Sequence, residues 1–369
     1  MVIGFGASRA NTKERSGVEW YSYHLLDNLY KIDDKNRYFL YTPNKLAEDL
    51  KHFPANFQER ILKWPFKRFW TKGRMSLEMI ANKPDVLFVP AHVFPLVRAK
   101  KNVITWHDVG YEHYPETYTK WELASLKQGA HRACKSADII ITISNFTKKE
   151  IIKFYNVDPD RIKVIHLGCN HDRWHPIPAE AVKQFRQERN FNLPYFIYLG
   201  RLSLRKNIVC LIRMYNRFRQ EYREPHNLIL VGVSSTNQND IENEINISPY
   251  KNEIKKIGWL AMEQLPILVS GAQALVFPSI YEGFGLPAIE AMACGCPVIA
   301  SDAGSLPEVI GDAGLLEAAH NINGFVEKMI KVIEDSKLRQ DLINKGLIRA
   351  KQFSWGKCAK ETLEVLESV

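Results

Sequence analysis

The sequence predicts an α/β protein that contains two domains with parallel sheets. At 369 residues the chain is too long for one ordinary hydrophobic core and suits two domains of about 150–200 residues each. Short runs rich in β-branched and aromatic residues alternate with helical patterns along the chain, which is typical of βαβ units. These runs fall into two sets. The stretch 172–182 between them contains two prolines and no clear period, and we interpret it as an interdomain linker.

The predicted strands follow from the apolar runs in each set. The first set covers residues 2–6, 37–42, 85–90, 102–106, 138–143 and 163–167. The second set covers residues 195–200, 227–232, 253–258, 274–279 and 297–301. Helices are expected between the strands. After the first strand of the second set, apolar residues recur at helical spacing, namely Ile208, Leu211, Ile212, Tyr215 and Phe218. Residues 323–369 carry further helical pattern, with an aromatic break at 353–355.

Composition narrows the class of protein. The six cysteines are scattered, so they form neither a disulfide framework nor a zinc-binding spacing. No apolar run approaches the roughly 20 residues that span a bilayer, and the N-terminus lacks the features of a secretory signal. A cytoplasmic protein is therefore expected. The net charge of +9 favours anionic partners. Nucleic acid, anionic lipid and phosphorylated small molecules are the three kinds of anionic partner that this positive charge allows.

Residues 274–301 read as a strand, a glycine-rich turn, a helix and a strand. Pro287 suits the first turn of the helix and Gly295 suits its end, so the helix is expected at about 287–294. Gly283 and Gly285 allow the backbone to come close to a ligand. The N–H groups at the start of the helix favour a phosphate there.

Two glutamates flank this predicted anion site. Glu282 precedes the turn, and Glu290 lies about one turn into the helix. Carboxylates accept hydrogen bonds from vicinal hydroxyls, so the arrangement suits a molecule with sugars on both sides of a diphosphate. A nucleotide sugar has that form. In the simpler alternative, Glu290 only favours the helix dipole and Glu282 is a solvated loop residue.

A second cluster lies in GRLSLRKN, residues 200–207. Arg201, Arg205 and Lys206 follow the predicted strand 195–200, and ligands of open α/β sheets bind at the carboxyl ends of strands. Three cations there suit a diphosphate, although basic loop residues are often merely solvated. Two phosphate-suited turns in the same half of the chain favour the binding function.

The pattern FPSIYEGFGLPAIEAMACGCPVIASDAGSLPEVIGDAGLL, residues 277–316, carries a resemblance to a known family. Together with YLGRLSLRKN and GWL before it, this pattern resembles the retaining, nucleotide-sugar-dependent glycosyltransferases of the GT-B fold. More narrowly, it resembles the large family that includes phosphatidylinositol mannosyltransferase and many lipopolysaccharide glycosyltransferases. ADIIITISNFTKKEII, VIHLGCNHDRWHP and the closing FSW also match, so the resemblance spans nearly the whole chain.

The resemblance implies two Rossmann-like domains that face each other across a cleft. Residues 1–175 would bind the acceptor, with the helix 354–369 packed back on them, and residues 176–353 would bind the donor. The implied donor-binding residues are Gly17, Gly200, Arg201, Arg205, Lys206, Glu282, Gly283, Phe284, Gly285, Leu286 and Glu290.

Within this set the resemblance assigns individual roles. Arg201 and Lys206 would hold the diphosphate, with the backbone of Phe284 and Gly285 at the distal phosphate. Glu282 would bind hydroxyls of the transferred sugar. Glu290 would bind the ribose.

The first domain contributes two further residues through the resemblance. His107 ends the strand 102–106 and matches the family histidine that contacts the transferred sugar, so it joins Glu282, Arg201 and Lys206 in the implied catalytic set. The alternative is a histidine held within a strand-end network with Asp108. Gly17 matches the N-terminal glycine loop, although Ser16 stands where many members have a second glycine.

The resemblance also implies the chemistry. It favours front-face displacement, in which the acceptor hydroxyl attacks on the side from which the nucleoside diphosphate leaves. No cofactor and no metal are expected. The spacings of His92, His107, His113 and His131 fit no regular metal motif. The co-substrate would be a GDP- or UDP-sugar. The tyrosine-rich loop 108–118 resembles acceptor-side segments in mannosyl- and related transferases of bacterial surface polysaccharide pathways, which makes GDP-mannose the first donor to try.

Residues 60–77 hold six basic residues, four aromatic residues and no acidic residue. This composition suits an anionic membrane surface, because aromatic rings sit at headgroup level and cations meet lipid phosphates. A peripheral location on the inner face of the cell membrane is therefore expected. The resemblance places this segment in the acceptor domain, which implies a lipid-linked or glycan acceptor. In the alternative, the segment is a partly buried strand and loop with solvated charges. No nucleic-acid recognition motif accompanies the charge.

Two competing functions share the implied architecture. A sugar-nucleotide epimerase of the GT-B fold binds the same ligands, but its expected acidic and histidine set is not seen here. A non-catalytic sugar-nucleotide-binding subunit is the other alternative. The joint presence of Arg201, Lys206, His107, Glu282 and Glu290 argues against it.

Overall fold

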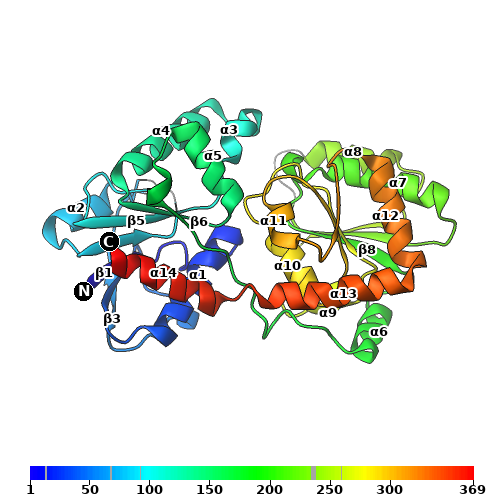
Figure 1. Cartoon of the computed structure of the whole chain (residues 1–369), viewed down its shortest axis with the longest axis horizontal. Coiled ribbons are helices and arrows are strands. Elements are labelled where there is room, and N and C mark those ends of the chain that lie inside the picture. Colours follow the sequence, from blue (N-terminus) through cyan, green and yellow to red (C-terminus); the bar gives the residue numbers. More distant parts are fainter. Residues whose placement is uncertain (13–14, 67–68, 92, 234–237, 259) are drawn as a thin grey trace. The chain divides into compact units, whose positions relative to one another are not determined.

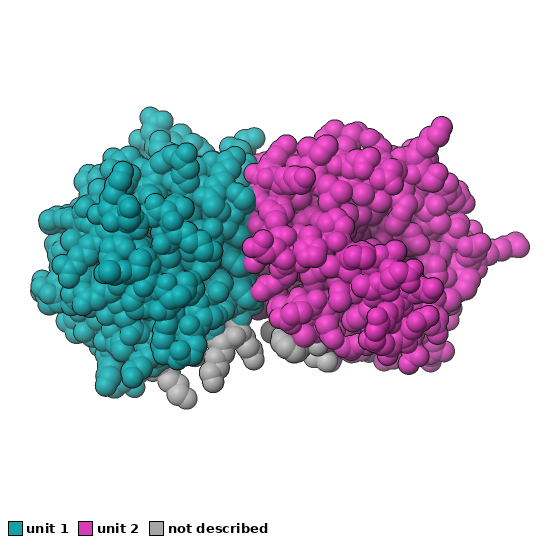
Figure 2. All heavy atoms as spheres, turned by 90° about the horizontal axis from the view of Figure 1, so that it is seen from below, with its two compact units in different colours: residues 1–168, 354–369 teal, residues 169–353 magenta. Residues whose placement is uncertain are grey.

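The chain divides into two compact units, shown in Figures 1 and 2. The computed structural model describes residues 1–369 except 13–14, 67–68, 92, 234–237 and 259. Unit 1 comprises residues 1–168 and 354–369, and unit 2 comprises residues 169–353. Each unit is built on its own parallel sheet, which confirms the predicted α/β class. The boundary at 168/169 precedes the expected boundary at 175/176.

The described residues of unit 1 form a parallel sheet in the order β3-β2-β1-β4-β5-β6-β7. The strands are β1 (Val2–Gly6), β2 (Arg37–Thr42), β3 (Phe57–Ile61), β4 (Val86–Val89), β5 (Lys101–Trp106), β6 (Ile139–Thr142) and β7 (Ile162–Val164). The central strands are apolar runs that are buried on both faces, as expected for parallel sheets. Strand β3 was not predicted, because its FQERI sequence is largely polar and lies at the edge of the sheet.

Six α-helices belong to the described part of unit 1. They are α1 (Gly17–Ile32), α2 (Arg74–Ala81), α3 (Gly110–His113), α4 (Lys120–Ser136), α5 (Asn145–Tyr155) and α14 (Trp355–Ser368). Short 3₁₀ turns occur at Glu48–Leu50, Pro115–Thr117 and Pro159–Arg161. Helix α14 comes from the end of the chain and packs against α1. At this contact His24 stacks between Trp20 and Trp355, with ring centroids 5.3 and 5.0 Å away.

The described residues of unit 2 form a second parallel sheet in the order β10-β9-β8-β11-β12-β13. Its strands are β8 (Tyr195–Leu199), β9 (Asn227–Val231), β10 (Ile254–Ile257), β11 (Leu275–Phe277), β12 (Val298–Ser301) and β13 (Leu315–Glu317). Strand β13 was not predicted. It has three residues at the edge of the sheet, and none of them is fully buried.

The helices of unit 2 cover its sheet. Those described are α6 (Ala179–Glu188), α7 (Ile208–Glu221), α8 (Gln238–Ile247), α9 (Leu265–Ser270), α10 (Leu286–Ala293), α11 (Leu306–Ile310), α12 (Ile322–Glu334) and α13 (Ser336–Lys351), with a 3₁₀ turn at Leu204–Lys206. Helix α7 packs against α8 and α12, whereas α10 packs against α9 and α13. The predicted linker 172–182 is wrong in its second half, because α6 begins at Ala179. The apolar face of α6 becomes evident only beyond residue 182, where Phe185 is buried.

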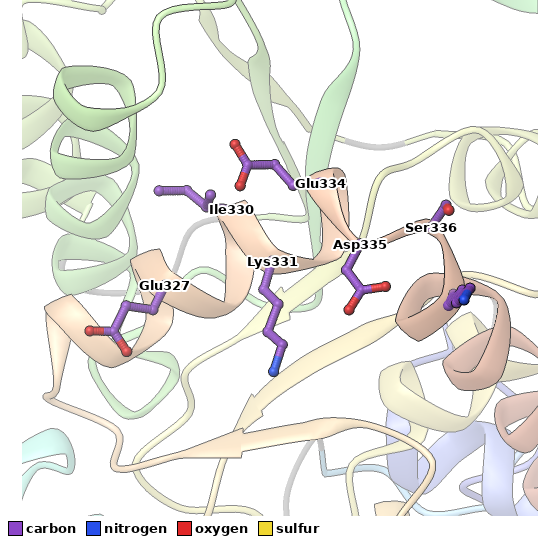
Figure 3. A pocket seen from close by; sticks show the side chains of 7 residues that line it. Glu327, Ile330, Lys331, Glu334, Asp335 and Ser336 are labelled. Atoms are coloured by element: carbon purple, nitrogen blue, oxygen red, sulfur yellow. The ribbon is translucent and has the colours of Figure 1, made fainter.

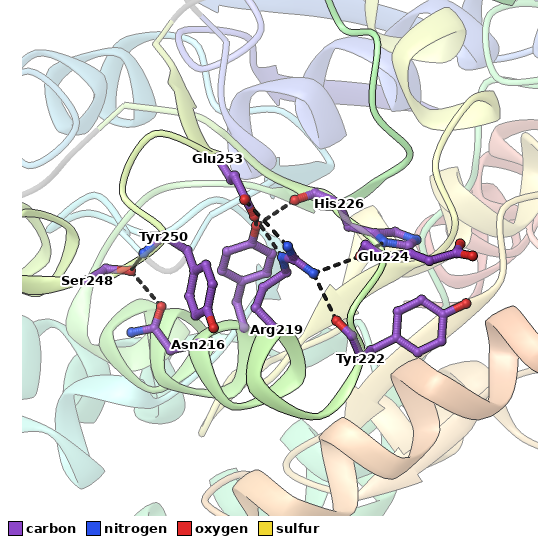
Figure 4. A network of polar contacts seen from close by, with 9 residues as sticks. Asn216, Arg219, Tyr222, Glu224, His226, Ser248, Tyr250 and Glu253 are labelled. Atoms are coloured by element: carbon purple, nitrogen blue, oxygen red, sulfur yellow. Dashed lines mark hydrogen bonds and ion pairs between the residues drawn. The ribbon is translucent and has the colours of Figure 1, made fainter.

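A polar network ties the end of α7 to the segments that precede β9 and β10 (Figure 4). The Arg219 side chain is 8% exposed, and its Nε donates to Glu253 Oε2 at 2.7 Å. Its Nη1 donates to the backbone oxygens of Tyr222 and Glu224 at 2.8 and 2.7 Å. The Tyr215 hydroxyl donates to Glu253 at 2.8 Å. The buried guanidinium is therefore both neutralised and hydrogen-bonded, as a buried charge requires.

No helix in the described ranges combines the length and the apolarity that crossing a bilayer requires.

Candidate functional site

The loops after β8 and β11 meet where the strand order of the unit 2 sheet reverses. Strands β8 and β11 are hydrogen-bonded neighbours, and the chain continues from β8 to β9 on one side and from β11 to β12 on the other. Such a reversal opens a crevice at the carboxyl ends of the strands, where α/β proteins bind ligands. The Ile280 N–H donates to Arg205 O at 2.9 Å across the two loops. The structure thus brings together the two segments that the sequence suggested for phosphate binding.

Lys206 and Glu282 form an ion pair inside this corner. Their side chains are 19% and 11% exposed, and the Lys206 ammonium lies 5.5 Å from the centroid of the Phe277 ring. The resemblance assigns Lys206 to the diphosphate and Glu282 to sugar hydroxyls, and their pairing was not predicted. The two residues are 76 positions apart, so no local pattern connects them.

The backbone of Glu282 is held by the segment after β12. Ser305 donates from its N–H and from its hydroxyl to Glu282 O, each at 3.1 Å. Gly304 adopts φ +65°, and a Cβ at that position would lie 2.5 Å from Glu282 O. Only glycine accommodates both the conformation and the close approach. Gly304 and Ser305 were not predicted as site residues, although DAGSLPE follows the predicted strand 297–301 and contains this glycine–serine pair.

Helix α10 begins at this corner. It runs from Leu286 to Ala293, one residue earlier at each end than predicted, with Pro287 in its first turn. Gly285 precedes it at φ +97°, and a Cβ there would lie 2.6 Å from the Leu306 side chain. The glycine therefore lets the chain turn into the helix, whose N-terminus carries the partial positive charge of the helix dipole and so favours an anion. Phe284 packs edge-on against Phe353, with ring centroids 5.7 Å apart.

Glu290 lies on α10 beyond its first turn and is partly exposed. This position does not support the alternative in which Glu290 only stabilises the helix dipole, because that dipole acts mainly within the first turn. Burial raises the pKa of Glu290 to about 7, although the positive charge of Arg173 opposes the shift. Within the described residues, no group donates a hydrogen bond to its carboxylate. A partly buried carboxylate that receives no hydrogen bond from the protein is suited to accept hydrogen bonds from ligand hydroxyls.

The cations predicted for the diphosphate have different surroundings. Arg201 is exposed, and its guanidinium forms no ion pair with any residue that the structure describes. Its backbone oxygen accepts a hydrogen bond from the Tyr198 hydroxyl at 3.2 Å. The Arg205 guanidinium lies 5.9 Å from the centroid of the Tyr281 ring. Arg201 is therefore the cation that an incoming anion can reach without displacing a partner.

Ser279 is a further polar residue at this corner that sequence analysis missed. It follows β11 and is fully buried, and its hydroxyl has no hydrogen-bond partner in the described part of the chain. Its backbone oxygen accepts a hydrogen bond from the Ser301 hydroxyl. No sequence feature distinguishes this serine from an ordinary loop serine.

His107, Asp108 and Gly17 belong to unit 1. His107 follows β5 and is 9% exposed. Its Nε2 lies 3.3 Å from Pro90 O, and its ring is 4.9 Å from that of Tyr21. The Asp108 carboxylate accepts from the Gly110 N–H at 2.8 Å. His107 and Asp108 thus each have partners at the end of β5.

Gly17 is the first residue of α1, and a Cβ there would meet no atom within 4 Å. Ser16, the departure from the common glycine pair, precedes the helix and donates from its N–H and its hydroxyl to the Glu19 carboxylate. Ser16 therefore stabilises the start of α1 through these two hydrogen bonds. Among the histidines considered for a metal, His92 lies outside the described residues.

Two parallel-sheet α/β units and an anion-suited corner at a strand-order reversal fit the class of the GT-B glycosyltransferases. The comparisons with known proteins agree. Glycosyltransferase Family 4 matches residues 15–173, and Glycosyl transferases group 1 matches residues 181–349. The chain therefore belongs to the glycosyltransferases that these two family models describe, which confirms the resemblance found in the sequence.

Curated relatives carry related names. The chain is 29% identical over 339 residues to the O-antigen chain mannosyltransferase B of Escherichia coli, which covers 92% of this chain and 87% of that protein. It is 30% identical over 239 residues to the O-antigen chain mannosyltransferase RfbU of Salmonella typhimurium, which covers 64% of this chain and 61% of that protein.

Solved structures share the fold along the whole chain. The sucrose-phosphate synthase of Thermosynechococcus elongatus aligns with a TM-score of 0.77 and 20% identity, covering 100% of this chain and 98% of that one. WaaG, a glycosyltransferase involved in lipopolysaccharide biosynthesis, aligns with a TM-score of 0.75 and 16% identity, covering 99% of each chain. Anabaena HepE in complex with UDP-glucose aligns with a TM-score of 0.76 and 19% identity, covering 100% of each chain. These likenesses confirm the GT-B fold.

Proposed function

We propose that this glycosyltransferase is a retaining enzyme that transfers a hexose, with mannose as the first candidate, from a nucleoside diphosphate sugar to a glycan or lipid-linked acceptor. The names of its curated relatives support mannose and a place in cell-surface polysaccharide biosynthesis. The complex of HepE with UDP-glucose supports a nucleotide sugar as donor. The corner of unit 2 where the loops after β8 and β11 meet carries the proposal.

The diphosphate would lie between Arg201 and the start of α10. Arg201 is an exposed cation, and the start of α10 after Gly285 supplies the positive end of a fixed dipole. Both would stabilise the negative charge that develops as the glycosidic bond breaks. Losing one such contact typically costs about 3 kcal/mol, or roughly a hundredfold in rate. These fixed positive groups would perform the task that Mg²⁺ performs elsewhere, so the proposed reaction needs no metal.

Lys206 and Glu282 would act together. Their ion pair orients the Glu282 carboxylate inside the corner, which suits it to accept hydrogen bonds from the transferred sugar. Lys206 would contact a phosphate oxygen with its remaining N–H donors, because an ammonium group has three. Glu290 would accept hydrogen bonds from the ribose.

No protein nucleophile is assigned to a covalent intermediate. The acceptor hydroxyl would attack on the face that the diphosphate leaves, and its proton would pass to a phosphate oxygen of the leaving group. In unit 1, His107 would contact the transferred sugar. Gly17 would belong to the loop near the phosphate and the acceptor. The enzyme would work at the inner face of the cell membrane.

A panel of GDP-, UDP- and ADP-sugars tests the donor assignment. GDP-mannose is expected to raise the melting temperature most, and isothermal titration calorimetry measures its Kd. Arg201→Ala should weaken that Kd by about tenfold or more, because a charge-assisted contact is lost. Arg223→Ala is the matched control, since Arg223 is an exposed arginine of the same unit outside the corner. Equal Kd values for the two variants would refute the phosphate assignment.

Product analysis tests the reaction. The anomeric configuration of the product, measured by NMR, should equal that of the donor, and turnover should persist in EDTA. Inversion would exclude the retaining mechanism. Conversion of the donor into an epimer without any acceptor would indicate the epimerase alternative.

A further inference from the structure

Strand β8 of unit 2 buries two tyrosines completely. Tyr195 lies at its amino end and Tyr198 near its carboxyl end, and both are 0% exposed. Burying a hydroxyl costs free energy unless it is hydrogen-bonded, and phenylalanine would fill the same space without that cost. The Tyr195 hydroxyl donates to Leu268 O at 2.7 Å, and the Tyr198 hydroxyl donates to Arg201 O at 3.2 Å. Only the second of these bonds therefore reaches a residue of the candidate site.

The peptide unit between Arg201 and Leu202 is held at both of its polar ends. Its oxygen accepts from the Tyr198 hydroxyl, and its N–H, which belongs to Leu202, donates to Val233 O at 3.0 Å. A peptide unit is planar, so hydrogen bonds at its two opposite ends together resist its rotation. The orientation of this plane sets the backbone direction at Arg201. It therefore also sets the direction in which the exposed Arg201 side chain leaves the chain.

Gly200 makes room for the bond from Tyr198 to Arg201. It lies between the two residues at φ +131°, and a Cβ there would come within 3.3 Å of the Tyr198 hydroxyl oxygen. The missing side chain leaves the hydroxyl free to reach the Arg201 carbonyl. Burial, and to a smaller extent the negative charge of Glu282, raise the pKa of Tyr198 well above its ordinary value. The hydroxyl therefore keeps its proton at neutral pH and can donate it to a carbonyl.

The ring of Tyr198 has a separate packing role. It stacks on Phe277 with centroids 5.7 Å apart and planes inclined by 23°. The Lys206 ammonium lies 5.5 Å from the centroid of the same Phe277 ring. Phenylalanine in place of Tyr198 would keep this stacking and remove only the hydroxyl. The two roles of the side chain can therefore be tested apart.

We propose that Tyr198 is a positioning residue for donor binding, whose hydroxyl fixes the Arg201 peptide so that the guanidinium faces the diphosphate. The inference rests on the proposed function, because it takes Arg201 as a ligand of the diphosphate. Tyr198 is fully buried and acts through Arg201 rather than by touching the donor. Without the hydroxyl, the Arg201–Leu202 peptide is held at one end only. Ordering the arginine when the nucleotide binds then costs affinity.

Calorimetry on the full chain, with GDP and UDP as probes, tests the proposal. Tyr198→Phe should raise the Kd of the nucleotide that binds the native protein more tightly by about fivefold, which corresponds to the loss of one ordinary hydrogen bond. Tyr195→Phe is the matched control, because it removes a buried tyrosine-to-carbonyl hydrogen bond from the other end of the same strand. Both variants should lower the melting temperature, and Tyr195→Phe should leave the nucleotide Kd unchanged.

A double-mutant cycle with Arg201→Ala separates positioning from general destabilisation. In the Arg201→Ala background, Tyr198→Phe should change the Kd by less than about twofold, because the side chain that it orients has been removed. An equal loss of affinity in both backgrounds would overturn the proposal. So would an unchanged Kd in Tyr198→Phe, or an equal rise of the Kd in Tyr195→Phe.

The outcomes separate this inference from the proposed function. If Arg201→Ala weakens nucleotide binding but Tyr198→Phe does not, the phosphate assignment stands and the positioning role alone is refuted. If Arg201→Ala leaves the Kd unchanged, the phosphate assignment itself is refuted, and the positioning role falls with it.

Discussion

Replacing Glu290 by glutamine should stabilise unit 2 at alkaline pH. Burial raises the pKa of this carboxyl from its ordinary value of 4.5 to about 7. In the unfolded chain the group ionises at a lower pH than in the folded protein, so folding is opposed wherever the carboxylate is charged. The stability of the native protein therefore falls as pH rises from about 4.5 to about 7, and above that it stays lowered.

The size of the effect follows from the two pKa values. At about 1.36 kcal/mol for each pKa unit, the full cost is about 3 kcal/mol. Between pH 5 and pH 8 the cost rises by about 2.5 kcal/mol, since part of the unfolded population is already ionised at pH 5. Glu290→Gln removes the charge but keeps the shape, so its advantage over the native protein should grow by about that amount across the same range.

Native-state hydrogen exchange, followed by mass spectrometry on peptides of β8 and β11, gives the free energy of unfolding of unit 2 at each pH. Glu327→Gln is the control, because Glu327 is exposed on α12 beside a surface pocket (Figure 3). If the difference between Glu290→Gln and the native protein changed by less than about 0.5 kcal/mol between pH 5 and pH 8, the burial argument would be refuted. The same variant should bind the nucleotide more weakly, so that stability is gained at the expense of ligand binding.

Three further predictions concern unit 2. Lys206→Ala leaves the Glu282 carboxylate without its cation and should lower the free energy of unfolding by about 2–3 kcal/mol. Adding Glu282→Gln should recover part of that free energy, and urea unfolding of both variants measures it. Gly304→Ala should reduce turnover at least about tenfold, because its Cβ would displace the Glu282 backbone. Gly356→Ala is the control and should be neutral, because its Cβ would meet no atom closer than 3.9 Å. Equal turnover rates of the two variants would exclude the clash. Arg219→Ala should destabilise unit 2 by about 2–4 kcal/mol without changing the nucleotide Kd, since it breaks the buried network but no contact of the corner; a changed Kd would contradict that separation.

The sequence by itself determined the central strands and the start of α10. Strands β1 and β8 are continuous apolar runs, and such runs are buried on both faces of a parallel sheet wherever they lie. The start of α10 depends on Gly285 and Pro287, whose conformational limits act within a few residues. These features are local, so they can be predicted from a window of the chain.

Only the tertiary structure decided the relations between distant residues. The pairing of Lys206 with Glu282 and the contact of Gly304 with the Glu282 backbone join segments that no local pattern links. The edge strands β3 and β13 exist because a neighbouring strand pairs with them, since their own sequences lack a buried run. A groove in unit 1 likewise collects side chains from the segments after β1, β2, β3 and β4 and from α4. Their common physical reason is that packing and long-range hydrogen bonds, rather than local propensity, choose which surfaces meet.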